Sequence, residues 1–116
     1  MQRAQGDLAE ALKSYRDSLA IRERLAKSDP SNAGWQRDLS VSYINVGDVQ
    51  KAQGDLAGAL KSYRDNLAIA ERLAKSDPTN AGWQRDLALS YGRIGDMLRV
   101  EDRAAKRRCR ARRSSH

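Results

Sequence analysis

The chain contains an internal repeat with a period of 48 residues, and this repeat constrains the fold more than any other feature. When the sequence is shifted by 48 residues, residues 4–51 overlay residues 52–99 with 36 identities out of 48. Periods of about 20 to 50 residues are typical of solenoids, in which equivalent units stack on their neighbours. The repeat therefore predicts a stack of similar units.

Each copy is predicted to form two helices. Apolar residues recur at helical spacing, and no segment sustains the alternation that is typical of a strand. In the first copy the spacing is carried by Leu8, Leu12, Tyr15 and Leu19, and then by Trp35, Leu39, Tyr43 and Val46. We expect helices over about residues 7–27, 33–53, 55–75 and from 81 onward, which makes the chain all-α with four long helices.

The predicted helix starts carry residues that suit turns and caps. Gly6 with Asp7, and Gly54 with Asp55, combine a residue that tolerates left-handed backbone with a side chain that accepts the first amide protons of a helix. In the first copy, Glu10 completes a capping box with Asp7. The second copy has glycine in place of this glutamate, so it lacks the reciprocal hydrogen bond.

The succession of residue types along the repeat resembles the tetratricopeptide repeat family. The resemblance is carried by the helix crossings and by the connections between helices: Tyr43, Val46, Gly47, Gly54, Asp55, Leu56, Ala59, Tyr63 and Leu67, followed by Asp77, Pro78, Thr79, Asn80 and Ala81. It covers nearly all of residues 4–100. It implies an α-α superhelix, a solenoid of antiparallel helix hairpins in which Gly47 and Gly95 are small at close crossings and Tyr15 and Tyr63 fill the gaps between hairpins.

This chain departs from the family pattern in two ways. The family unit has about 34 residues, so a unit of 48 is longer by about four helical turns, and both helices of each hairpin should be long. In addition, Ser18 and Asn66 stand where the family prefers alanine, and Gln50 stands where it prefers an aromatic residue. We expect looser packing at these three positions.

The repeat frame leaves one uncovered face on the first predicted helix and one on the last. The chain opens on the second helix of a unit and closes on the first helix of another. The uncovered residues are predicted to be Leu12, Tyr15 and Leu19 on the first helix and Tyr91, Ile94 and Leu98 on the last. Because each face is the sequence that meets the other inside this chain, we expect self-association, with a dimer favoured. The alternative is that the sequence is a fragment of a longer repeat array.

In members of the family, the first helix of each unit lines a concave surface that grips a peptide or a partner helix. The resemblance places eight residues there: Val41, Ile44, Asp48 and Lys51, with Leu89, Gly92, Asp96 and Arg99 in the next unit. Eight of the 12 mismatches between the copies fall in residues 40–51 and their counterparts. A variable face on a constant scaffold is expected of a surface that reads a partner, although drift at weakly packed positions would give the same pattern.

The expected function is a non-catalytic scaffold that binds a protein or peptide partner, which the sequence does not identify. One branch of the family binds C-terminal carboxylates with basic and amide side chains, but Asp48 and Asp96 would repel such a ligand. A groove of mixed charge with an apolar strip, suited to an amphipathic helix, is favoured instead. We expect no catalytic residue and no cofactor.

The positive charge of the chain is concentrated near its end. The formal net charge is +7, and residues 101–116 hold 7 basic and 2 acidic side chains against 15 and 13 in residues 1–100. We therefore divide the chain into a repeat domain over 1–100 and a basic tail over 101–116, which is either a helical extension or disordered. The tail would bind nucleic acid or another anionic polymer only nonspecifically, or it is simply a solvated extension.

Several classes of protein are excluded by composition. Cys109 has no second cysteine to pair with, and with His116 it cannot complete a zinc site, so we expect no disulfide and no metal. No apolar run suits a membrane span or a signal peptide, and we expect a cytoplasmic protein. Trp35 and Trp83 open equivalent helices, which favours a packing role over stacking on a ligand.

Overall fold

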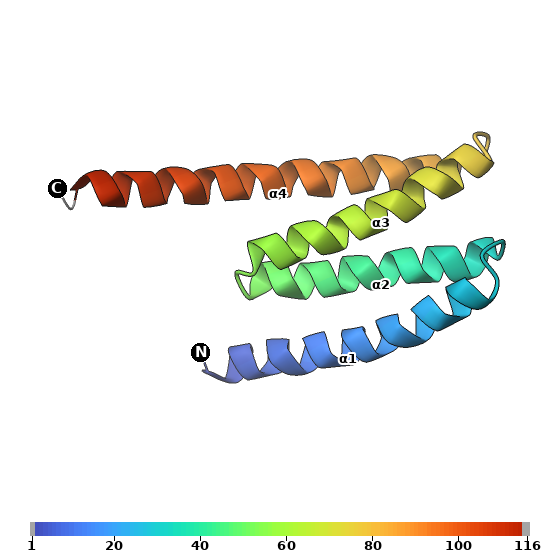
Figure 1. Ribbon diagram of the computed structural model, residues 1–116, viewed down its shortest axis with the longest axis horizontal. Helices are drawn as coiled ribbons and strands as arrows, with labels where there is room; N and C mark the ends of the chain where they lie inside the picture. The colour runs from blue at the N-terminus through green and yellow to red at the C-terminus, as the bar shows by residue number, and fades with distance from the viewer. Residues whose placement is uncertain (1, 115–116) are drawn as a thin grey trace.

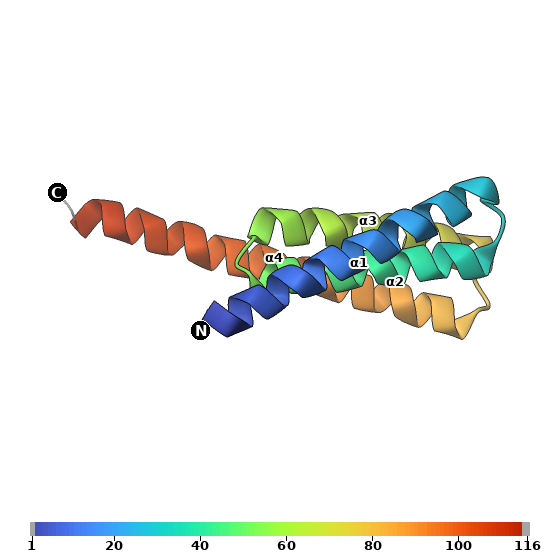
Figure 2. The ribbon, with the colours of Figure 1, turned by 90° about the horizontal axis from the view of Figure 1, so that it is seen from below.

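The computed structural model describes residues 2–114, with side chains described for residues 6–113, and it places them in four helices. These are α1 (Gln2–Ser28), α2 (Ala33–Ala52), α3 (Leu56–Ser76) and α4 (Ala81–Ser114). Each helix packs against its neighbour in the sequence, and the helices lie in a row with α1 and α4 at the outer edges (Figure 1). Figure 2 shows that α1 is inclined across α2. The predicted all-α stack of antiparallel hairpins is confirmed.

The turn between α2 and α3 is formed as predicted. Gly54 has a positive φ of 82°, and the Asp55 side chain accepts the amide hydrogen of Gly58 with an N···O distance of 3.0 Å. A Cβ atom on Gly58 would lie within 2.3 Å of the Asp55 carboxylate. The glycine that replaces Glu10 in the second copy therefore makes room for the capping side chain.

The connections before α2 and α4 are each closed by an asparagine cap. The Asn32 and Asn80 side chains each accept an amide hydrogen, from Trp35 and Trp83 respectively, at 3.0 Å. These bonds satisfy helix amides that have no partner within the helix. The equivalent hydrogen bonds show that the short linker adopts the same structure in both copies.

The predicted turn at Gly6 and Asp7 is not formed. Helix α1 begins at Gln2 and runs through both residues, so the predicted start at residue 7 and the capping box with Glu10 are wrong. At Gly54 the chain reverses because α3 packs back on α2, whereas among the described residues no helix lies before α1. Continuing the helix adds one backbone hydrogen bond per residue, which offsets the cost of about 1 kcal/mol for a glycine inside a helix.

Helix α4 continues past the end of the repeat. It runs without a break from Ala81 to Ser114, so the predicted tail is helical at least as far as Ser114. Residues 101–114 thus belong to the same helix as the last part of the repeat. In Figure 1 this extension projects beyond the ends of the other helices.

Two clusters of buried side chains hold the stack together. One joins Ala26, Leu39, Ile69 and Leu73 from α1, α2 and α3, with Leu19, Tyr43 and Trp83 packed against it. The other joins Ala59, Leu60, Tyr63 and Met97 from α3 and α4, with Leu56 and Ile94 packed against it. The packing role predicted for Trp83 is confirmed. Burial of these apolar surfaces is what drives the helices together, because helices of this kind are marginal in isolation.

The close crossing predicted at Gly47 is confirmed. A Cβ atom there would lie 2.7 Å from the Tyr63 ring, so the ring rests directly on the α2 backbone. Nearby, Gln50 is buried and accepts a 2.6 Å hydrogen bond from the Ser62 hydroxyl. The expectation of loose packing at Gln50 is therefore wrong, since its amide is paired with a serine that the adjacent helix supplies.

Candidate functional site

A groove lies between α2 and α4, with α3 at its floor. We call it the α2–α4 groove. It encloses about 180 Å³ and is lined by Arg37, Ser40, Val41, Ile44, Asn66, Asp86, Leu89, Ser90 and Arg93. Val41, Ile44 and Leu89 form an apolar strip, and Leu89 is half exposed. Three of the eight residues predicted for the partner-binding face are thus brought together.

A buried hydrogen-bond chain forms the floor of the groove. The Asn66 amide nitrogen donates to the Ser40 hydroxyl at 2.5 Å and to the Ser40 carbonyl at 3.2 Å. The Ser90 hydroxyl donates to the Asn66 amide oxygen at 2.6 Å. Asn66 therefore ties α2, α3 and α4 together, and the expectation of loose packing at this position is wrong. A fully paired polar side chain fixes the register of its neighbours.

In the first copy, a different side chain pairs with the equivalent buried serine. Ser42 is the counterpart of Ser90, and its hydroxyl accepts a 2.8 Å hydrogen bond from the Arg22 guanidinium, which also donates to the Asp38 carbonyl at 3.1 Å. In the second copy alanine stands at position 70, the counterpart of Arg22. Two mismatches between α1 and α3 are thus coupled: serine at position 18 goes with Arg22, and Asn66 goes with alanine at position 70. In this way each copy keeps one side chain that pairs with the buried serine of the following helix.

The rim of the groove carries opposite charges. Arg37 and Asp86 form an ion pair across it, with a distance of 3.4 Å between Nε and Oδ2. Both side chains are more than a third exposed, so the pair stabilises the fold by only about 0–1 kcal/mol.

Sequence reasoning missed the charged members of the groove. Arg37 lies one turn before Val41 on the same helix face, and Asp86 and Arg93 flank Leu89 at spacings of three and four residues. Extending the predicted face by one turn toward the start of each helix would have found Arg37 and Asp86, and including the neighbour four residues after Leu89 would have found Arg93. Asn66 carried a different signal, since it is a mismatch between otherwise nearly identical helices.

The remaining predicted groove residues lie on the surface outside the α2–α4 groove. The Asp48 carboxylate accepts a 2.5 Å hydrogen bond from the Tyr63 hydroxyl. Burial, and then this bond, raise the pKa of Tyr63 above its ordinary value. Asp96 instead forms an ion pair with Arg99 one turn away. Lys51 is exposed, and so is Gly92, whose added Cβ atom would meet nothing within 4 Å.

Among the described residues, all large apolar side chains that are exposed lie on the two outer helices, α1 and α4. They are Tyr15, Ile21 and Leu25 on α1 and Leu89, Tyr91 and Leu98 on α4. Tyr15, Tyr91 and Leu98, three of the residues expected from the sequence to be uncovered, are thus exposed, and Ile21 and Leu25 are exposed on the same two helices.

Two of the residues predicted to be uncovered are not. Leu19 packs against the cluster formed by α1, α2 and α3, and Ile94 packs against the cluster formed by α3 and α4. The face that each helix leaves open is thus rotated from the predicted one. Leu12 is partly buried.

A comparison with family models gives one match: the model of the tetratricopeptide repeat matches residues 3–31, which span α1 and the start of the linker that follows it. The chain carries a tetratricopeptide repeat. No curated protein and no solved structure matches the chain. Tetratricopeptide repeats are generally non-catalytic and mediate protein–protein interactions.

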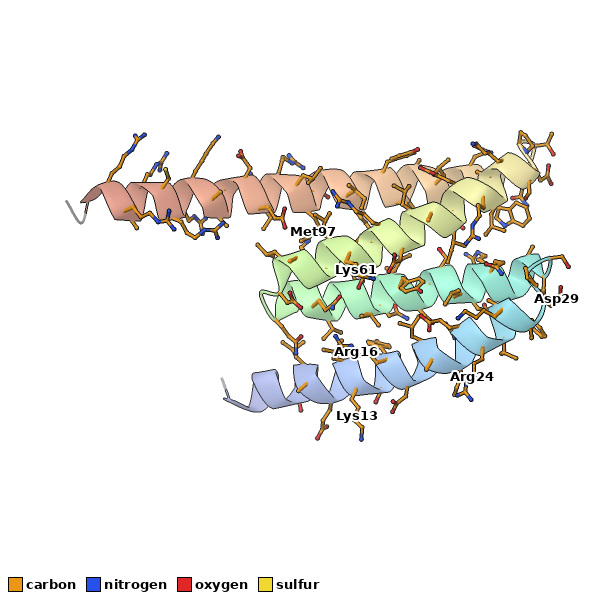
Figure 3. All side chains as sticks on the ribbon, in the orientation of Figure 1. Lys13, Arg16, Arg24, Asp29, Lys61 and Met97 are labelled. Atoms are coloured by element: carbon orange, nitrogen blue, oxygen red, sulfur yellow. The ribbon has the colours of Figure 1, made fainter. Side chains whose placement is uncertain are left out.

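Outside the matched tetratricopeptide segment, the C-terminal part of α4 is a second distinct surface. Residues 102–113 are mostly exposed, and Lys106 pairs with Asp102 at 3.2 Å. Figure 3 shows nitrogen-bearing side chains on both sides of this part of α4, beyond the buried Met97. Cys109 is exposed with a free thiol.

Metal-binding groups and membrane-spanning helices are both absent from the described part of the chain. Among these residues, no group of three or more His, Cys, Asp or Glu side chains is placed to hold a metal ion. None of the described helices is long and apolar enough to cross a membrane.

Proposed function

We propose that this chain is a non-catalytic interaction module that holds an amphipathic helix or peptide of a partner protein in the α2–α4 groove. The observation that carries the proposal is the apolar strip of Val41, Ile44 and Leu89, which lines the groove between charged side chains and in which Leu89 is half exposed. An apolar strip with a polar rim is the pattern that helix-in-groove recognition uses.

The charges of the rim favour one kind of partner. Two guanidinium groups, from Arg37 and Arg93, stand against one carboxylate, from Asp86. A partner helix whose apolar stripe is flanked by acidic residues would complement this excess of positive charge. The buried chain through Asn66 supports the proposal from below, because it holds the walls of the groove at a fixed distance before the partner arrives.

Selection from a displayed library of amphipathic helices, followed by affinity measurement on the selected peptides, tests this proposal. Leu89→Glu should weaken the selected peptides about tenfold or more, because it places a charge in the apolar strip. Ala68→Glu, at an exposed position of α3 outside the groove, is the matched control and should leave affinity unchanged. Binders that tolerate Leu89→Glu as well as Ala68→Glu would show that the groove is not the site.

We also propose self-association through the outer helices as a second candidate function. It is supported by the confinement of exposed large apolar side chains to α1 and α4 among the described residues. Light scattering after size exclusion, over a tenfold range of concentration and with reductant present to silence Cys109, measures the mass. A mass that stays at 12.9 kDa throughout would contradict self-association.

The basic extension of α4 supports only a weaker, nonspecific role. Its side chains would bind nucleic acid or another polyanion by releasing counterions, without aromatic residues to stack on bases. Removing residues 101–116 should abolish retention on heparin at low salt. Retention that survives the deletion would assign this binding to the repeat instead. The cytoplasmic location stays a prediction from the sequence.

A further inference from the structure

Two depressions on the surface are built from the same residue types, one in each copy. The first, which we call the α1–α2 trough, is lined by Glu23, Ala26, Lys27, Pro30, Gln36, Leu39 and Tyr43. The second, the α3–α4 trough, is lined by Glu71, Ala74, Lys75, Pro78, Gln84, Leu87 and Tyr91, the residues 48 positions later in each case. The two troughs are therefore equivalent surfaces in different surroundings.

The α1–α2 trough is covered along one side by α3. Arg72 lines it opposite Glu23, and Ile69 and Leu73 pack against Leu39 and Ala26. No described helix occupies the equivalent place beside the α3–α4 trough, and Tyr91 there remains half exposed. The contact of α3 with the α1–α2 trough thus shows what kind of helix would cover the α3–α4 trough.

Helix α1 carries the side chains that would fill the α3–α4 trough. Ile21, Arg24 and Leu25 are identical in type to Ile69, Arg72 and Leu73. Ile21 is 55% exposed, whereas its counterpart Ile69 is 3% exposed. The same helical face is therefore buried in α3 and open in α1.

An empty seat for a tyrosine ring lies on α4 beside this trough. Inside the chain, the Tyr63 ring rests on Gly47 and its hydroxyl donates to Asp48. The counterparts of these two residues on α4 are Gly95, where an added Cβ atom would meet nothing within 4 Å, and the exposed Asp96. The counterpart of the ring is Tyr15, which is 39% exposed on α1.

From these four observations we infer that α1 of a second copy docks against α4 over the α3–α4 trough, repeating between chains the contact that α3 makes with α2 within one chain. The inference rests on the self-association proposed above and specifies its interface. Tyr15 of the incoming copy sits on Gly95, and its Ile21 and Leu25 pack toward Leu87. Arg24 comes beside Glu71, as Arg72 and Glu23 line one depression inside the chain.

The mismatches between the copies are compatible with this contact. Asn66 needs Ser40 on the preceding helix as a partner, but at the interface between chains Ser18 replaces the asparagine and Ala88 replaces Ser40. The interface therefore lacks both the asparagine amide and the serine hydroxyl that pair inside the chain, so docking buries no unpaired amide. Leu98 replaces Gln50 and adds exposed apolar surface to the same face.

The contact joins two different surfaces, one on α1 and one on α4. Each added chain therefore presents a fresh α4 face at one end and a fresh α1 face at the other. An assembly built from this head-to-tail contact increases in size with concentration, unless the rotation between successive chains closes it into a ring. An isologous dimer would instead use the same face on both chains.

Two variants that each block one face test the inference. Ile21→Arg places a charge on the α1 face, and Gly95→Gln fills the tyrosine seat on α4 with a good helix-forming residue. Each variant alone should raise the apparent dissociation constant about tenfold or more. Mixed in equal amounts, the two variants should form a species of twice 12.9 kDa that does not grow, because one intact face of each kind remains.

The controls are an equivalent change on each helix away from the contact. Ala20→Arg lies on α1 at a position whose counterpart, Ala68, is also exposed, and Gly92→Gln lies one turn before Gly95. Both should assemble like the wild type, and circular dichroism should show unchanged helix content in all four variants.

Three results would overturn the inference. A wild-type chain that is monomeric at every concentration would remove both self-association and this interface. A wild type that assembles while the mixture stays monomeric would retain self-association and reject the head-to-tail contact. An assembly that Ile21→Arg abolishes and Gly95→Gln leaves intact would show that α1 pairs with α1.

Discussion

Helices α1 and α3 have nearly the same sequence but very different surroundings. Tyr15 is 39% exposed and Tyr63 is 3% exposed, although both lie in the segment Ala-Leu-Lys-Ser-Tyr-Arg-Asp. The difference arises because α3 lies between α2 and α4, whereas among the described residues α1 has a neighbouring helix, α2, on one side only and reaches α3 just through the cluster that contains Ala26. In a repeat protein, therefore, burial is a property of the neighbours, and the same residue type can be core in one copy and surface in the next.

Truncating the two tyrosines should show the largest contrast between the copies. Tyr63→Ala leaves a cavity beside Met97 and removes the hydrogen bond to Asp48, and should lower the free energy of unfolding by about 3–5 kcal/mol. Tyr15→Ala should lower it by less than about 1 kcal/mol. Urea unfolding at a concentration where the chain is monomeric measures both. Equal losses would contradict the difference in burial between the two rings.

The two equivalent glycines should respond in opposite directions to alanine. Gly47→Ala places a Cβ atom 2.7 Å from the Tyr63 ring and should destabilise the fold by about 1–3 kcal/mol. Gly95→Ala meets open space and should stabilise α4 by about 0.5–1 kcal/mol, because alanine is the better helix former. Thermal melting of the two variants beside the wild type decides the point, and a loss of stability in both would contradict the open seat at Gly95.

The coupled polar positions should show the next largest contrast. Asn66→Ala leaves Ser40 and Ser90 without their buried partner and should cost about 1–2 kcal/mol. Ser18→Ala removes a side chain with no equivalent network and should change stability by no more than about 0.5 kcal/mol. A matched pair of denaturant titrations provides the comparison. If Asn66→Ala proved neutral, the chain of hydrogen bonds would not tie the helices together.

Alkaline pH should separate Tyr43 from its counterpart Tyr91. Each hydroxyl donates to a glutamate at 2.9 Å, Glu23 and Glu71 respectively. Burial, and then the bond to Glu23, raise the pKa of Tyr43 to about 12, whereas the bond to Glu71 is the main cause of the raised pKa of the exposed Tyr91. The raised pKa favours the protonated tyrosine in the folded state, so its contribution to stability is present below pH 10 and is lost as the pH rises to about 12.

The measurement is stability against pH for two phenylalanine variants. Tyr43→Phe should flatten the loss of stability between pH 10 and about 12, and Tyr91→Phe should flatten it less. Absorbance of the ionised phenol gives the titration directly. Identical profiles for both variants and the wild type would show that neither hydroxyl couples to folding.

Much of the fold could be predicted from the sequence because its signals are local. The period of 48 residues, the apolar spacing and the caps at Asn32, Asp55 and Asn80 lie within a few residues of the structures they specify. The start of α1 could not be predicted in the same way. Gly6 and Gly54 stand in the same sequence context, and only the packing of α3 on α2 makes one a turn and leaves the other inside a helix.

The site was less predictable because it depends on contacts between helices. The family resemblance placed Val41, Ile44 and Leu89 on the concave face, and these three line the α2–α4 groove. The rotation of α1 and α4 about their own axes decides that Leu19 and Ile94 pack inward while Ile21 stays open. That rotation is set by the crossing of whole helices, which the pattern along a single helix does not contain.

The two ways of pairing the buried serine give the units an order. The Arg22 version needs only the helix that follows it, since both of its acceptors lie on α2. The Asn66 version needs a helix on each side, since its partners lie on α2 and α4. The two units are therefore not interchangeable. The first unit needs no helix before it, whereas the second unit needs a helix on both sides. A chain rebuilt with its two units exchanged would keep its composition and its period and would still leave an asparagine at the head without its upstream serine.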